Sequence, residues 1–299
     1  MKKRFLILPI ILLLLLFGCE GSDSYAQVAA TTLPVYEFTS ALCENTDITV
    51  TRLITEEVSC LHDYSLNVRQ VKAAEAAEVI VISGAGMEEF MDDILRGKYT
   101  IDSSSGIELL CSSEEGHDHD ASSEESHGHE GHSHEHDPHI WLSPLHAMDM
   151  VRNICAGLAR QYPEFADTFS ANEARLLEQL TQLQEYGEIQ LQDLSCRELI
   201  TFHDGFGYLA DCFGLHILEA IEEESGSEAS AAELIHMIAL VETHQLPAVF
   251  VEKNGSASAP GIISRETGAK VFSLDMAMSG DGYFAAMYHN IDTLKEALQ

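Results

Sequence analysis

Residues 67–84 read NVRQVKAAEAAEVIVISG, and this stretch decides the fold. Its first part carries apolar side chains at helical spacing, which predicts a helix over 67–78. Residues 79–82 (VIVI) follow as a fully apolar strand that Ser83-Gly84 ends. A helix that leads directly into a buried strand is typical of an alternating α/β chain with parallel pairing and right-handed crossovers.

The same alternation extends outward from this stretch in both directions. Upstream, we expect strands at 26–33 and 48–54 with a helix through Cys43 between them, and downstream a fourth strand at 107–111. A second series follows later in the chain, with strands at 198–202, 215–220, 248–252 and 270–274 and helices at 205–213, 230–244, 260–267 and 282–298. The chain therefore reads as two α/β lobes.

A long helix is predicted between the two lobes, at 164–194. Apolar residues recur along it at helical spacing, and Pro163 suits the first turn. Such a helix is roughly 45 Å long and could act as a strut. The predicted domains are a signal peptide (1–18), a tether (19–25), an N-terminal lobe (26–148) with a disordered loop (112–137), a helical region (149–194) and a C-terminal lobe (195–299).

The first residues resemble an export signal. Basic residues at 2–4 precede an apolar run at 5–17, which is shorter than the roughly 20 residues needed to span a bilayer. Residues 16–19 (LFGC) resemble a bacterial lipobox, so Cys19 is the predicted lipidation site and the mature protein is expected outside the cytoplasm, anchored to the cell membrane or periplasmic. A plain secretory signal or an uncleaved anchor are the alternatives.

Composition excludes some functions and leaves others open. The formal net charge of −33 repels nucleic acid and anionic lipid head groups and attracts cations, although acidity also keeps a surface protein soluble. Six further cysteines form no CxxC motif. They could form disulfides in many different pairings, or they could be buried free thiols. The sequence does not distinguish these alternatives.

Histidines crowd the stretch before residue 139. Neutral imidazole prefers zinc, nickel or copper to magnesium or calcium, and the interleaved acidic residues add no apolar surface to pack. We therefore expect a disordered, metal-collecting loop. Its accessory histidines are His117, His119, His127, His129, His132, His134 and His136.

Four polar residues stand near strand ends or outside helix interiors, where ligands bind in open parallel sheets. They are His62, His139, His203 and Asp275. Three imidazoles and one carboxylate form a set suited to tetrahedral zinc. Each residue also has a simpler reading: His203 could cap the helix that follows it, and Asp275 suits a turn.

Several segments together resemble a known family, the zinc/manganese group of ABC-transporter solute-binding proteins. They are CLHDYSLNVRQVKAAEAAEVIVISGAGMEEFMDDIL, DPHIWLSP, QYPEF, TFHDGFGYLA and ETGAKVFSLD leading to YHNIDTL. The likeness runs through nearly all of the chain after the signal. It implies two Rossmann-like lobes joined by a rigid helix, with a metal in the cleft between them and His62, His139, His203 and Asp275 as its ligands.

The resemblance also bears on the metal. Manganese-selective members have Glu where this chain has His203, so the chain is similar to the zinc branch, and its acidic His-rich loop agrees. Two departures leave the ligand set open. Leu61 stands where relatives usually have Pro, with Cys60 beside it as a possible soft ligand, and the position of Asp275 is filled by a carboxylate or by water in different members.

The expected function is zinc capture outside the cytoplasm by a monomer that delivers Zn²⁺ to a membrane permease driven by an ATPase. A manganese- or iron-binding receptor of the same family is one alternative. A zinc-dependent hydrolase is another, but no HExxH motif or general base accompanies the histidines. An extracellular zinc buffer or adhesin without a permease partner is a third.

Overall fold

The computed structural model describes residues 25–56, 61, 64–111, 136–221, 229–253 and 255–299. The predicted signal peptide, Cys19, Cys60, His62 and all the accessory histidines except His136 lie outside these residues. Among the helices that the structure describes, none is long and apolar enough to cross a membrane.

The N-terminal lobe is built on a four-stranded parallel sheet of order β2-β1-β3-β4. Its strands are β1 (Val28–Ala30), β2 (Val50–Arg52), β3 (Val79–Ile82) and β4 (Tyr99–Asp102). Its helices are α1 (Leu33–Leu42), α2 (Val68–Ala76) and α3 (Asp92–Leu95), the last preceded by a 3-10 turn at Glu89–Met91. Asn67 and Gln70 form a capping box that starts α2, so the predicted helix and the VIVI strand after it are confirmed.

The fourth strand is not the predicted one. The prediction of a strand at 107–111 is wrong, because β4 pairs with β3 in the register Val79↔Tyr99. The backbone of residues 107–111 makes other contacts. Leu110 donates its N–H to Tyr208 Oη, and Cys111 forms an isolated antiparallel bridge with His136. Residues 107–110 therefore join no strand of the sheet.

The C-terminal lobe repeats the same strand arrangement. Its parallel sheet has the order β6-β5-β7-β8. The strands are β5 (Glu198–Thr201), β6 (His216–Ala220), β7 (Ala248–Glu252) and β8 (Lys270–Leu274), and the helices are α6 (Gly207–Cys212), α7 (Ala231–His244), α8 (Ser258–Thr267) and α9 (Tyr283–Leu298). All four strands predicted for this half of the chain are confirmed.

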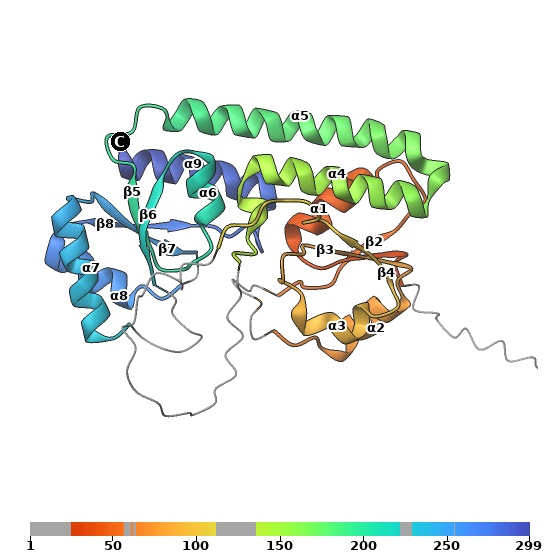
Figure 1. Ribbon diagram of the computed structural model, residues 1–299, viewed down its shortest axis with the longest axis horizontal. Coiled ribbons are helices and arrows are strands. Elements are labelled where there is room, and N and C mark those ends of the chain that lie inside the picture. Colours follow the sequence, from red (N-terminus) through yellow and green to blue (C-terminus); the bar gives the residue numbers. More distant parts are fainter. Residues whose placement is uncertain (1–24, 57–60, 62–63, 112–135, 222–228, 254) are drawn as a thin grey trace, which may run out of the picture.

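Two helices join the lobes. After a 3-10 turn at Ile140–Leu142, α4 (Pro144–Gln161) is followed by a 3-10 turn at Pro163–Phe165 and by α5 (Ala166–Leu191). Helix α5 is the predicted linking helix; it runs along both lobes and packs on α4, α1 and α9 (Figure 1). The helical region begins earlier than the predicted residue 149, because Ser143 and Pro144 start α4.

One hydrophobic core extends through both lobes. It includes Ile80 of the first sheet, Leu180 of α5 and Phe250 of the second sheet, and a smaller cluster fills the outer part of the C-terminal lobe. Gly187 lets α5 approach the Phe213 ring closely, since a Cβ at this position would lie 2.3 Å from that ring. The predicted fold class, two parallel-sheet lobes joined by a long helix, is confirmed, and the shared core opposes large movement between them.

Candidate metal site

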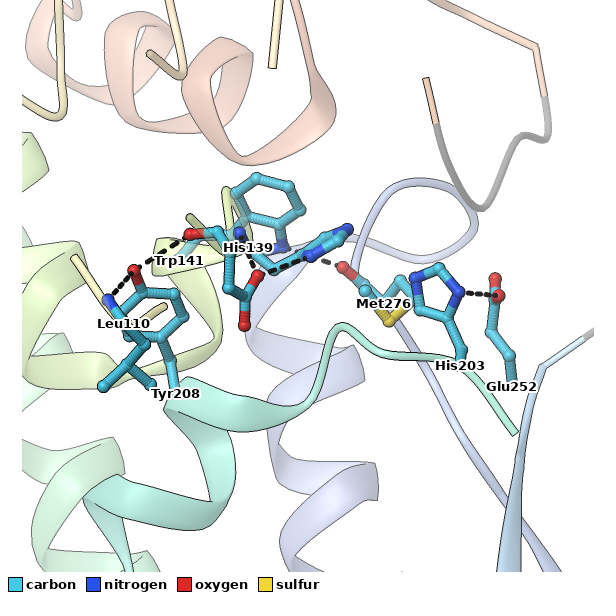
Figure 2. Close-up of polar contacts among 8 residues, drawn as sticks. Leu110, His139, Trp141, His203, Tyr208, Glu252 and Met276 are labelled. Carbon is cyan, nitrogen blue, oxygen red and sulfur yellow. Dashed lines mark hydrogen bonds and ion pairs between the residues drawn. The ribbon is translucent and has the colours of Figure 1, made fainter. Parts of the chain in front are cut away.

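Two of the predicted ligands lie side by side. His203 follows β5, and His139 directly precedes the Ile140–Leu142 turn. The centres of their rings are 5.3 Å apart at an interplanar angle of 78° (Figure 2). Residues 64 positions apart in the chain are thus brought together where the second sheet ends and the first lobe meets it.

Asp137 holds the His139 ring through one ring nitrogen and leaves the other ring nitrogen unused. Its Nδ1 lies 2.8 Å from Asp137 Oδ1, and its backbone N–H donates to the same oxygen at 2.9 Å. The Nε2 atom is buried and has no hydrogen-bond partner within the part of the chain that the structure describes. An oriented imidazole with a buried, unused nitrogen fits a metal ligand, since a histidine bound to metal through Nε2 usually donates Nδ1–H to a carboxylate.

His203 also faces a carboxylate. Its Nδ1 is 3.8 Å from Glu252 Oε2, at the end of β7, and both side chains are largely buried (Figure 2). Gly205 makes room for the ring: a Cβ at this glycine would lie 2.7 Å from both His203 Cδ2 and Met276 Cε. The imidazole is therefore confined on one side by the Gly205 backbone.

Asp275 is buried at the end of β8 and fully engaged. Oδ2 lies 2.7 Å from Lys253 Nζ, and Oδ1 accepts the backbone N–H of Ala277 at 2.9 Å. Asn290 exchanges two hydrogen bonds of 2.7 Å with its backbone. Within the described ranges, no group of three or more His, Cys, Asp or Glu side chains is placed to hold a metal ion. Among the described residues, Asp275 is thus not grouped with His139 and His203 in such a cluster, and His62 lies outside these residues.

The segment after Asp275 is bound to the N-terminal lobe. Trp141 Nε1 donates to the carbonyl of Met276 at 2.8 Å (Figure 2), and Arg52 Nη2 donates to that of Met278 at 2.6 Å. Tyr283 Oη donates to the carbonyl of Trp141 at 2.8 Å. These contacts place the carboxyl end of β8 against the lobe that carries His139.

His136, the one accessory histidine described, is exposed and forms a β-bridge with Cys111. The sequence left the pairing of the cysteines open. The cysteines that the structure describes are all free thiols: Cys43, Cys111, Cys155, Cys196 and Cys212. No disulfide joins any two of these.

Sequence reasoning missed three residues at the site: Asp137, Glu252 and Lys253. Asp137 is two residues before His139, so its Asp-Pro-His spacing was a local signal for a carboxylate–imidazole pair. Glu252 and Lys253 stand at the end of a predicted strand, as His203 and Asp275 do. Applying the strand-end argument to every strand would have found them.

A family model and several known proteins match this chain over most of its length. The family model described as zinc-uptake complex component A periplasmic matches residues 28–297. The zinc-binding protein AdcA of Streptococcus pyogenes serotype M3 is 29% identical over 292 residues, which cover 92% of this chain and 56% of that protein. The high-affinity zinc uptake system protein ZnuA of Bacillus subtilis is 28% identical over 294 residues, covering 94% of this chain and 90% of that protein.

A solved structure agrees in fold over nearly all of the chain. The Zn(II)-bound ZnuA-like domain of Streptococcus pneumoniae AdcA superposes with a TM-score of 0.75 at 27% identity, covering 92% of this chain and 99% of that domain. The chain spans about half the length, 56%, of the S. pyogenes relative that it matches.

The two-lobed parallel fold places the chain in the class of ZnuA-like domains, with the histidine pair at the junction of the lobes. More narrowly, the chain belongs to the family of zinc-uptake complex component A. This membership confirms the predicted family.

Proposed function

We propose that this protein captures Zn²⁺ outside the cytoplasm and delivers it to the permease of an ABC transporter. The observation that carries the proposal is the pair of adjacent imidazoles, His139 and His203, with the buried Nε2 of His139 unused. Two neutral nitrogen donors select zinc over manganese, which prefers oxygen ligands. Relatives named for zinc binding support the same cargo.

In this proposal each residue at the junction has a definite task. His139 and His203 coordinate the cation, and His62 completes the imidazole set. Asp137 keeps the His139 ring in one orientation and directs Nε2 to the cargo. Asp275 supplies a negative charge beside the site. A dication bound by neutral imidazoles keeps its full charge, and a nearby carboxylate reduces the cost of burying it.

Metal analysis tests the proposed cargo. Protein purified without added metal and then offered zinc and manganese together should retain one equivalent of zinc. H139A and H203A should each lose that tight equivalent, because a tetrahedral site that loses an imidazole is left with too few ligands. Preferential retention of manganese or iron would favour the alternative receptor, and tight zinc retained by both variants would refute the site.

We propose further that the chain is exported, lipidated at Cys19 and active as a monomer at the outer face of the membrane. The lipobox-like LFGC and the name zinc-binding lipoprotein AdcA of a Streptococcus pneumoniae relative, 29% identical over 99% of this chain, support export and lipidation. Labelling of cells with a fatty-acid analogue should mark the wild type but not C19S, and C19S should appear in the soluble fraction. The adhesin alternative stays a prediction.

A further inference from the structure

The ion pair between Lys253 and Asp275 brings a cation to the carboxylate that was predicted to bind the metal. The two residues directly follow neighbouring parallel strands, β7 and β8, whose register pairs Glu252 with Leu274. The backbone N–H of Lys253 donates to the Leu274 carbonyl at 2.7 Å, and the Nζ–Oδ2 distance is also 2.7 Å. Sheet register therefore brings the two residues side by side, within reach of this ion pair.

The two partners differ sharply in their access to water. The Asp275 side chain is 9% exposed, whereas the Lys253 side chain is 46% exposed. A carboxylate that is this deeply buried requires a partner of opposite charge or strong hydrogen bonds. A lysine ammonium on a flexible four-carbon stem can leave for water at little cost, since only its tip has to move.

We propose that Lys253 is the counter-ion of Asp275 while the site holds no cargo, and that the incoming dication displaces it. This inference rests on the proposed function. A dication near Asp275 repels the ammonium and competes for the same oxygen, so part of the binding free energy is used to break the ion pair. Lys253 thereby weakens zinc binding and speeds its release, which suits a protein that must hand its cargo on.

The decisive measurement is the zinc dissociation constant and release rate of K253M, determined by competition with a chromophoric chelator. Methionine keeps much of the stem and removes the charge. K253M should bind zinc about 10-fold more tightly, mainly through slower release. K253R keeps the charge and should bind with nearly wild-type affinity. K270M, an exposed lysine at the opposite end of β8, is the matched control and should bind like the wild type.

A readout without metal accompanies this series. Metal-free K253M leaves Asp275 without its ammonium, so its melting temperature should fall below that of the wild type and recover when zinc is added. In a D275N background, K253M should no longer change the zinc affinity, because the lysine acts through that carboxylate.

The outcomes separate this inference from the proposed function. If the wild type binds zinc, H139A does not, and K253M binds as the wild type does, the function stands and the counter-ion role is refuted. Weaker zinc binding by K253M would also refute it, since Lys253 would then support the bound state. If neither the wild type nor K253M binds zinc, the proposed function itself fails.

Discussion

The Nδ1 atom of His139 lies 2.8 Å from Oδ1 of Asp137, and both side chains are buried. The backbone of Asp137 is itself bound from the other lobe, because Tyr208 Oη donates to its main-chain carbonyl at 2.9 Å (Figure 2). A residue of α6 thus holds the main chain that carries the carboxylate beside the His139 imidazole. The ligand geometry depends on the junction of the lobes as well as on the ligand itself.

Replacing Asp137 should lower zinc affinity without removing a ligand. D137A removes the acceptor of Nδ1, so the ring loses its orientation and zinc binding should weaken by roughly 10- to 100-fold. D137N keeps an acceptor oxygen and should show a smaller loss. Chelator competition measures both. D149N, at an exposed carboxylate paired with Arg152, is the control and should bind zinc normally. Equal zinc affinity of D137A and the wild type would show that the Asp137 carboxylate does not orient the ligand.

Gly205 should be sensitive to a single added methyl group. In G205A the new Cβ would lie 2.7 Å from His203 Cδ2 and 2.8 Å from its Nε2, so the ring must move. We expect zinc affinity to fall by about 10-fold or more, because ligand displacement on the ångström scale is poorly tolerated. The comparison is G261A in α8, where the nearest atom is 3.9 Å away and alanine favours the helix. Normal binding by G205A would mean that His203 is not confined as described.

The sequence predicted the sheets well because each strand is signalled locally. The strand VIVI at 79–82 is apolar throughout and AVFVE at 248–252 is apolar except for its last residue, as is typical of strands buried on both faces. The sequence did not predict β4, because Tyr99–Asp102 is only partly buried and contains polar residues. The more apolar segment 107–111 was predicted as the fourth strand in its place. Which of two such runs pairs with β3 is decided by tertiary contacts.

The site could be predicted only in part, for a related reason. His203 follows from its position after a strand, His139 from its place between the histidine-rich tract and an apolar segment, and both from the family resemblance. The pairing of Asp275 with Lys253 depends on the register between β7 and β8, which a single sequence does not specify. Burial of Glu88 was likewise not visible, because an acidic residue beside Glu89 in a loop looks exposed.

Glu88 should make stability depend on pH. Burial raises its pKa from 4.5 to about 7, although hydrogen bonds from Thr31, Gly84 and Ser83 act in the opposite direction. A carboxyl whose pKa is raised on folding contributes stability that is fully present below pH 4.5 and is lost as the pH rises through about 7. Relative to E88Q, the wild type should therefore lose on the order of 1–3 kcal/mol over this window.

Urea unfolding at several pH values measures this difference. E89Q, at the exposed neighbour, should follow the wild-type pH profile. Parallel profiles of the wild type and E88Q would show that Glu88 does not titrate on folding in this range.

The histidine-rich segment should be dispensable for the tight site. A variant that lacks residues 114–134 keeps Cys111 and His136, whose bridge holds the two ends of the segment together, so the deletion can be closed without strain on the lobe. Isothermal titration should still show one tight zinc, with the weaker binding events lost, because His139 and His203 are anchored independently. Loss of the tight event would assign the site to the deleted histidines.

The shared core predicts that zinc binding moves the lobes very little. Hinge closure would require the packing between α5 and both lobes to rearrange, and close-packed interiors resist this. Small-angle scattering of the variant without residues 114–134 should therefore give the same radius of gyration with and without zinc, within about 1 Å. H139A treated in the same way controls for unspecific zinc effects. A smaller radius with zinc, seen in the variant without residues 114–134 but not in H139A, would contradict the strut role of α5 and would mean that lobe movement releases the cargo. An unchanged radius would mean that release depends on local rearrangement around Lys253 and Asp275.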